Sequence, residues 1–208
     1  LLTEHPGVLL QTHLNENNEE IAWVKELYPK SRNYFDVYDK LGLSGPNSVF
    51  GHCIYNTAEE YKRMAETSSK AALCPTSNLF LGSGLFVLDE LESYGIDVAL
   101  ASDVGGGDSF SMFNVMSQAY KVCRLNGYNL DPVKAFYLTT LAAAKVLGVD
   151  NRIGNFESDK EADFIVLDLN ATDLITQKIQ TVTNISDLLF CLMMLGDDRL
   201  VNEVYILG

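Results

Sequence analysis

The stretch Gln11-Thr12-His13-Leu14-Asn15-Glu16 closes an apolar, β-like run over residues 7–14 and leads into a predicted helix over 15–27. Apolar residues recur in that helix at helical spacing, and acidic residues occupy its first turns, where they favour the helix dipole. A β-like run that passes directly into a helix is the repeating unit of α/β folds. We therefore expect the stretch to mark the carboxyl end of a buried strand.

The same pattern repeats three more times along the chain. The repeats are the β-like runs over 48–53, 70–74 and 97–101, and the last of these precedes predicted helices over 110–124 and 131–147. Asn56 or Thr57 is expected to cap the helix after the second run, with Glu59 or Glu60 completing the cap. Pro75 predicts a turn after the third run.

Alternating strands and helices of this length predict a parallel sheet with helices outside it. Four units are half of what a (β/α)₈ barrel needs, so we expect residues 1–148 to form half of such a barrel. The pattern changes after Gly148. Residues 149–208 are predicted to belong to a second, β-rich unit. It contains a β-like run over 162–167, a strongly apolar helix over 185–195 and an edge strand over 203–207.

The composition limits the possible partners. A formal net charge of −13 repels phosphate, so neither a nucleic acid nor an anionic membrane is an expected partner, and no apolar run is long enough to span a bilayer. The four cysteines are scattered without CxxC spacing, which predicts reduced core thiols in a cytosolic protein. The first residues lack a starting Met and a signal core, so we expect the sequence to begin inside a longer protein.

Three side chains with metal-ligand chemistry close three of the β-like runs: His13, His52 and Asp103. The carboxyl ends of barrel strands share one rim, so these side chains are expected to meet there. Imidazole and carboxylate are good ligands for a zinc-like ion, and such an ion lowers the pKa of bound water from ~15.7 toward ~7. Glu16, three residues after His13, is the expected proton shuttle.

Each of these residues also has a plain structural interpretation. A lone histidine at a strand end is more often a rim residue, Glu16 alone suits a helix first turn, and Asp103 before glycines suits a turn. Their joint occurrence on consecutive units favours the metal site. His5 is expected at the surface, Cys53 and Cys74 are expected to pack in the core, and the glycines at 105–107 are expected to let the backbone approach a flat ligand.

A family resemblance rests on these and further motifs. They are the stretch quoted above, Gly51-His52-Cys53, Cys74-Pro75-Thr76-Ser77-Asn78-Leu79, Ser102-Asp103-Val104-Gly105-Gly106, Ile153-Gly154-Asn155-Phe156-Glu157, Lys160-Glu161-Ala162-Asp163-Phe164, Leu195-Gly196-Asp197-Asp198-Arg199 and Glu203-Val204-Tyr205. The chain resembles the amidohydrolase superfamily of metal-dependent hydrolases over essentially its whole length. Within that superfamily, the segment from Tyr28 to Asp39 and the Gly-Asp-Asp-Arg motif near the end are similar to those of guanine deaminases.

The resemblance implies a (β/α)₈ barrel joined to a small β-sandwich built from both chain ends, with His13 on the fifth barrel strand. It implies that His13 and Asp103 bind one zinc ion, with Fe²⁺ as the alternative metal, and that Glu16 carries protons. His52 would orient the attacking hydroxide without binding the metal, and Asp103 would also accept a proton. The implied reaction is hydrolysis of the small purine guanine to xanthine and ammonia, in a cytoplasmic homodimer.

One departure from the family pattern stands out. Amidohydrolases supply two further ligands from a His-x-His motif on the first strand, and no such motif occurs in these 208 residues. We therefore expect the chain alone to be an inactive, partial enzyme that binds zinc weakly. Two alternatives stay open: a sister amidohydrolase acting on an adenosine derivative, a pterin or a triazine, and a barrel kept only as a scaffold. The joint presence of four reactive side chains argues against the scaffold.

Overall fold

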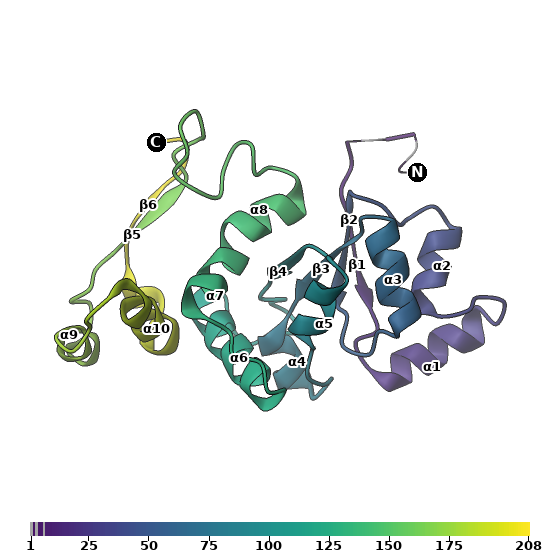
Figure 1. Ribbon diagram of the computed structural model, residues 1–208, viewed down its shortest axis with the longest axis horizontal. Coiled ribbons are helices and arrows are strands. Elements are labelled where there is room, and N and C mark those ends of the chain that lie inside the picture. Colours follow the sequence, from purple (N-terminus) through teal and green to yellow (C-terminus); the bar gives the residue numbers. More distant parts are fainter. Residues whose placement is uncertain (1, 3, 6) are drawn as a thin grey trace.

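The computed structural model describes residues 2, 4, 5 and 7–208. Four strands form one parallel sheet in chain order, β1-β2-β3-β4 (Figure 1). Their bounds are Leu10–Leu14 for β1, Ser48–His52 for β2, Lys70–Leu73 for β3 and Val98–Leu100 for β4. Each strand lies within its predicted run, so the prediction of an α/β fold with a parallel sheet is confirmed.

Helices connect and cover the strands. The connections are α1 (Asn18–Leu27) and α2 (Tyr34–Lys40) after β1, α3 (Ala58–Glu66) after β2, α4 (Pro75–Leu81) and α5 (Leu88–Ser93) after β3, and α6 (Met112–Leu125), α7 (Pro132–Thr139) and α8 (Leu141–Leu147) after β4. Phe50, Leu73 and Leu100 are buried in the main hydrophobic cluster, which also holds residues of α3, α5 and α6. Because strand side chains alternate between faces, these residues define the helix-covered face of the sheet.

The opposite face carries small side chains beside His13. The register aligns His13, Gly51, Ala72 and Ala99 in one row across the sheet. Gly51 and the two alanines add little side-chain volume to the row that contains His13. His13 itself is exposed, at the carboxyl ends of the strands.

The amino ends of the strands are closed by α8. Val146 packs with Val49 and Ala99 in a second, smaller cluster. Lys70, the first residue of β3, donates from Nζ to the carbonyl oxygens of Lys145 and Val146 at 2.8 and 3.0 Å. A cation at these carbonyls satisfies acceptors that the end of a helix leaves free. The two ends of the strands thus differ: α8 covers the amino ends, and the carboxyl ends carry the reactive side chains.

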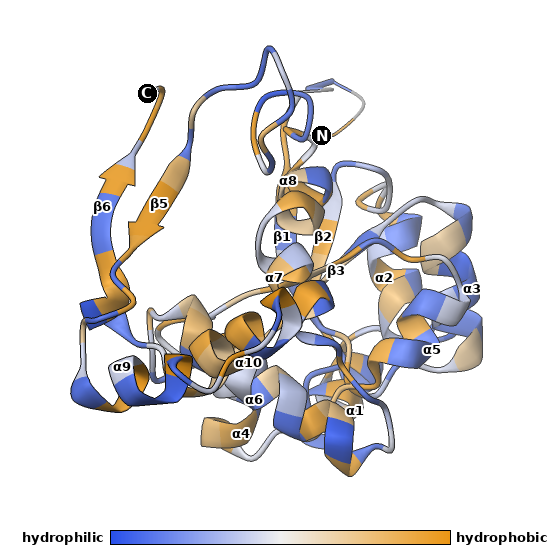
Figure 2. Ribbon diagram, turned by 60° about the vertical axis from the view of Figure 1, so that its left-hand side comes forward, coloured by the Kyte–Doolittle hydropathy of each residue, from blue (hydrophilic) through white to orange (hydrophobic). Residues whose placement is uncertain are grey.

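The last quarter of the chain forms a two-stranded antiparallel sheet and two helices. They are β5 (Phe164–Leu167), α9 (Asp173–Ile179), α10 (Ile185–Leu195), a 3₁₀ turn (Asp198–Leu200) and β6 (Val201–Tyr205). Helix α10 is largely hydrophobic and packs against α6 and α7 (Figure 2). Its buried Leu192 and Met193 join the main cluster. Residues 149–208 thus share a hydrophobic core with residues 1–148. The division into two units near Gly148 stays a prediction.

Several predicted element bounds are wrong for local reasons. The helix expected over 15–27 begins only at Asn18, because the side chain of Asn17 accepts from the Glu20 amide and caps it. Pro75 does not form the predicted turn after β3. It is the first residue of α4, because proline suits the first position of a helix. The helix predicted over 110–124 runs over Met112–Leu125, and the edge strand expected over 203–207 is β6, over Val201–Tyr205.

The helix predicted over 131–147 is broken in two at Thr140. There the backbone leaves the helical region, with φ −124° and ψ −97°. The hydroxyls of Thr139 and Thr140 both donate to the carbonyl of Phe136, at 3.0 and 2.8 Å. Such side-chain bonds compete with the helical backbone bonds, and two β-branched residues in a row add to the effect. The break separates α7 from α8.

Three smaller predictions are tested by the structure. Thr57, not Asn56, caps α3, and it forms a reciprocal capping box with Glu60. All four cysteines are free and buried, and His5 is exposed. Among the described residues, no helix combines the length and the apolar character that a bilayer crossing requires.

Candidate active site at the strand ends

His13, His52 and Asp103 meet at the carboxyl ends of the parallel strands. One ligand atom from each lies within 4.8 Å of the others. The His13 and His52 rings stack with their centroids 4.9 Å apart. His52 is fully buried, Asp103 is partly buried and His13 is exposed. The structure thus brings together three side chains that are up to 90 residues apart in the sequence.

Glu16 supplies a second carboxylate to the same place. Its Oε2 lies 3.8 Å from His52 Nε2, and Asp103 Oδ2 lies 3.8 Å from the same nitrogen. The other oxygen, Oε1, accepts a 2.7 Å hydrogen bond from the Ser83 hydroxyl. One carboxylate oxygen is therefore fixed by Ser83, while the second is left to face the imidazole.

Left-handed backbone aims the residues at the strand ends. Asn15, His52 and Asp103 have φ values of 52°, 70° and 49°. Strict alternation would turn His52 to the same face as Phe50, under the helices. The left-handed conformation at His52 breaks that alternation, and the ring stacks on His13. Such conformations cost of order 1–3 kcal/mol each and gather at functional sites.

A buried polar network fixes the loop between His13 and α1. Asn15 donates from Nδ2 to Asn56 at 2.8 Å and to Glu60 at 3.0 Å. The same Glu60 oxygen, Oε1, accepts from the Phe35 amide, and its other oxygen accepts from Thr57. Because every one of these groups is hydrogen-bonded, the network holds the left-handed Asn15, and with it the adjacent Glu16, in place.

Gly106 and Gly107, after Asp103, are required by close contacts within the chain. A Cβ on Gly107 would stand 2.2 Å from the Ser102 carbonyl oxygen, and one on Gly106 would stand 2.8 Å from Ser77 Oγ. The amides of both glycines donate to the Asp103 carbonyl, at 3.0 Å from Gly106 and 2.5 Å from Gly107. The close approach is thus to the chain itself, in a turn that clamps Asp103. Approach to a flat ligand stays a prediction.

The sequence pattern of the Amidohydrolase family matches residues 1–206. The chain belongs to the amidohydrolase family. Over all of its residues it is 47% identical to the guanine deaminase of Escherichia coli (strain K12), and it covers 47% of that protein. It is 38% identical to a probable guanine deaminase of Deinococcus radiodurans and covers 48% of it. This amidohydrolase chain therefore spans about half the length of the curated relatives it matches.

Solved structures give the same relationship. The E. coli guanine deaminase superposes with a TM-score of 0.97 at 46% identity, over 100% of this chain and 49% of that one. The guanine deaminase of C. acetobutylicum, with guanine bound in its active site, superposes with a TM-score of 0.86 at 32% identity, over 100% of this chain and 49% of that one. A zinc-bound adenosine deaminase from Xanthomonas campestris shares the fold, with a TM-score of 0.85 at 24% identity. The amidohydrolase fold expected from the resemblance is confirmed.

The donor set of this amidohydrolase fits a divalent metal. Amidohydrolases are metal-dependent, and two imidazoles with a carboxylate are the ligand types that zinc accepts. Two donors at 2.1 Å from a tetrahedral ion stand about 3.4 Å apart, so side-chain adjustments of about 1 Å would bring these atoms into range. His52 stands as close as the two expected ligands, although the resemblance assigns it no direct bond to the metal.

The thiols near the site of the amidohydrolase are packing groups. Burial, and then the charge of Asp103, raise the pKa of Cys74 to about 12, and burial raises the pKa of Cys53 as well. A thiol of such high pKa stays protonated at neutral pH and is a poor ligand and nucleophile. Both cysteines are buried, as predicted.

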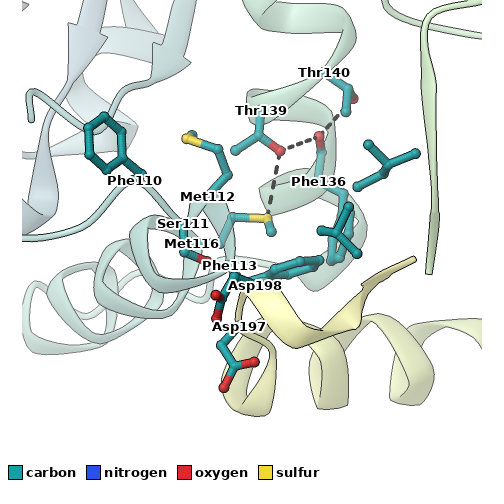
Figure 3. Close-up of a pocket in the computed structure, with 12 residues that line it drawn as sticks. Phe110, Ser111, Met112, Phe113, Met116, Phe136, Thr139, Thr140, Asp197 and Asp198 are labelled. Atoms are coloured by element: carbon teal, nitrogen blue, oxygen red, sulfur yellow. Dashed lines mark hydrogen bonds between the residues drawn. The ribbon is translucent and has the colours of Figure 1, made fainter. Parts of the chain in front are cut away.

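A separate cleft of about 410 Å³ lies between α6, α7 and the start of β6 (Figure 3). Its lining is mostly apolar and includes Phe110, Met116 and Phe136, together with the carboxylates of Asp197 and Asp198. Thr139 points into this region and donates to the Phe136 carbonyl. None of the side chains at the strand ends lines this cleft, and it contains no imidazole. The candidate chemistry of the amidohydrolase therefore belongs to the strand ends.

Two residues of the site carry roles that sequence reasoning missed. Asn78 accepts from His52, with 2.8 Å between Oδ1 and Nδ1, and Ser83 holds Glu16. Asn78 lies in a motif that carries the family resemblance, but its spacing gave no reason to pair it with His52. No sequence signal distinguished Ser83 from other serines.

Proposed function

We propose that the protein to which this chain belongs is a zinc-dependent deaminase that hydrolyses guanine to xanthine and ammonia. One observation carries the proposal: Glu16, His52 and Asp103 surround a shared point in a chain that is 47% identical over its length to a guanine deaminase. His13 and Asp103 would hold the metal. When bound, the ion supplies Lewis acidity and lowers the pKa of bound water, so that hydroxide forms near neutral pH.

The chain's own residues would then manage protons and orientation. Glu16 would carry a proton from the water to a ring nitrogen of the base and later to the departing amine. Ser83 supports this role, because it engages Oε1 and leaves Oε2 for the reaction. His52 would orient the attacking oxygen, since its Nε2 stands 3.8 Å from both carboxylates. Asp103 would accept a proton. The tetrahedral adduct at the amino-bearing carbon would collapse to xanthine and ammonia.

Three further features belong to the same proposal. Zinc is proposed as the metal because of the imidazole and carboxylate donors, with Fe²⁺ as the alternative. A cytoplasmic location suits four free, buried cysteines. A homodimer is proposed from the family resemblance alone. The small purine is the only partner that the proposal requires.

The deciding experiment measures ammonia and xanthine release by the full-length protein, with its metal content. Guanine is compared with an adenosine derivative, a pterin and a triazine. Turnover of guanine and of none of the other compounds supports the proposal. Turnover of another compound, with no turnover of guanine, would indicate a sister activity instead. The absence of both metal and turnover would favour a scaffold.

The shuttle role is tested by Glu16→Gln, which keeps the shape of the side chain but removes its basicity. We expect the turnover number to fall by a factor of about 10² to 10⁴, with the metal retained. Glu19→Gln is the matched control, because Glu19 is an exposed acid three residues further along the chain. A Glu16→Gln enzyme that turns over at the parental rate would disprove the shuttle.

A further inference from the structure

The segment after β3 supplies none of the proposed catalytic groups, yet two of its side chains, Asn78 and Ser83, contact the site directly. Asn78 lies in α4 and is 1% exposed, and His52 is likewise 1% exposed. Asn78 Oδ1 stands 2.8 Å from His52 Nδ1. With both groups buried, a carbonyl oxygen is the polar partner that the structure gives this ring nitrogen.

This contact fixes which nitrogen of the imidazole carries hydrogen. An amide carbonyl oxygen can only accept a hydrogen bond, so Nδ1 must be the donor. In the neutral ring the lone pair then belongs to Nε2. That nitrogen points between Glu16 Oε2 and Asp103 Oδ2, at 3.8 Å from each. His52 therefore presents an acceptor, not an N–H donor, to whatever group lies between the carboxylates.

The surroundings of this contact have two notable features. The His52 backbone is left-handed, with φ 70°, so the ring needs a contact that holds its orientation. The amide nitrogen of Asn78 is buried without a hydrogen-bond partner.

We propose that Asn78 is a positioning residue that holds His52 in its Nδ1–H form and so presents the Nε2 lone pair to an O–H of the attacking water. The inference rests on the proposed function for its catalytic meaning. Its structural content, the position of one hydrogen, stands independently of the substrate.

The direct test is nitrogen NMR of the full-length protein labelled at histidine. Spectra are recorded metal-free and zinc-loaded, at a pH well above the ordinary imidazole value of about 6.5. The His52 signal is identified by its loss in His52→Asn. We expect His52 to be hydrogenated at Nδ1 in the unaltered, metal-free protein. Hydrogen at Nε2 there would overturn the proposal without any variant being needed.

Matched variants test the cause. Asn78→Leu removes the acceptor at similar volume, so the ring should populate both forms, whereas Asn78→Asp keeps an acceptor and should keep the Nδ1–H form. Ser77→Ala deletes the neighbouring buried hydroxyl, which has no partner, and should leave the His52 spectrum unchanged. An unchanged His52 spectrum in a folded Asn78→Leu protein would also overturn the proposal.

Kinetics separate positioning from general packing. In Asn78→Leu the turnover number should fall about 10- to 100-fold with little change in KM, and Asn78→Asp should recover most of it. Equal loss in both variants would contradict the proposal. If guanine is not the substrate, the proposed function fails while the NMR result still stands, so the two failures can be told apart.

Discussion

Replacement of Gly107 by alanine should disable the site through the backbone alone. The new Cβ would stand 2.2 Å from the Ser102 carbonyl oxygen, 3.1 Å from that of Asp103 and 3.2 Å from Thr76 Oγ1. The first contact is with backbone, which cannot rotate away as a side chain would. Relief to an ordinary van der Waals distance requires the turn to move by about 1 Å.

The expected magnitudes follow from that displacement. Overpacking of this kind costs about 1–3 kcal/mol of stability. The Gly107 amide also donates to the Asp103 carbonyl, so the movement is transmitted to a proposed metal ligand. A misplacement of about 1 Å at a reacting centre can cost about 10²-fold in rate. We therefore expect a lower melting temperature, reduced zinc content and about 10²-fold lower kcat/KM.

The assays are thermal denaturation, metal analysis and ammonia release by the full-length protein. Gly7→Ala is the matched control, because nothing lies within 4 Å of its added Cβ, and it should change none of the three. Parental stability and activity in Gly107→Ala would refute the claim that the turn clamps Asp103.

Three other predictions concern Glu16, the buried carboxylate of Asp36 and the chain in isolation. Ser83→Ala should free Glu16 Oε1 and lower the turnover number about 10-fold with KM nearly unchanged, as measured by ammonia release. Burial raises the pKa of Asp36, but hydrogen bonds from Lys40 and Arg32 outweigh it and lower that pKa from 3.8 to about 2. Because the folded value lies below the unfolded one, the stabilisation is present above about pH 4 and is lost as the pH falls toward 2. The shift corresponds to about 2.4 kcal/mol, which screening of the half-exposed cations reduces to about 1–2 kcal/mol. In urea unfolding at pH 7, Asp36→Asn should be less stable than the parent by that amount. The difference in unfolding free energy between the two proteins should be smaller at pH 3. The 208 residues alone should bind zinc weakly and release no ammonia from guanine, and robust activity in that assay would contradict the need for further ligands.

The parallel sheet and the four reactive side chains could be predicted because both are local features of the sequence. Each β-like run is short, apolar and followed by polar residues, and His13, His52 and Asp103 stand where those runs end. The parallel topology alone then places them together at the carboxyl ends of the strands. The helix break at Thr140 could not be predicted, because it depends on the hydrogen bonds of the two threonine hydroxyls. The start of α4 at Pro75 was predicted wrongly because proline suits both a turn and the first position of a helix.

The contacts of Asn78 and Ser83 could not be predicted from the sequence for a different reason. Asn78 and His52 are separated by 26 residues, and Ser83 and Glu16 by 67. Each bond depends on how the loop after β3 folds back over the neighbouring strand ends. Periodicity reports which face of an element is buried, but it carries no information on which two polar side chains meet across elements.

The position of β1 and β4 at opposite edges of the sheet has a consequence for biosynthesis. His13 leaves the ribosome 90 residues before Asp103. At about 5–20 residues per second, this delay is roughly 5–18 s. During that interval the nascent chain exposes one imidazole, then a second, without the carboxylate that completes the set. The cluster of His13, His52 and Asp103 can therefore form only after β4 has been made.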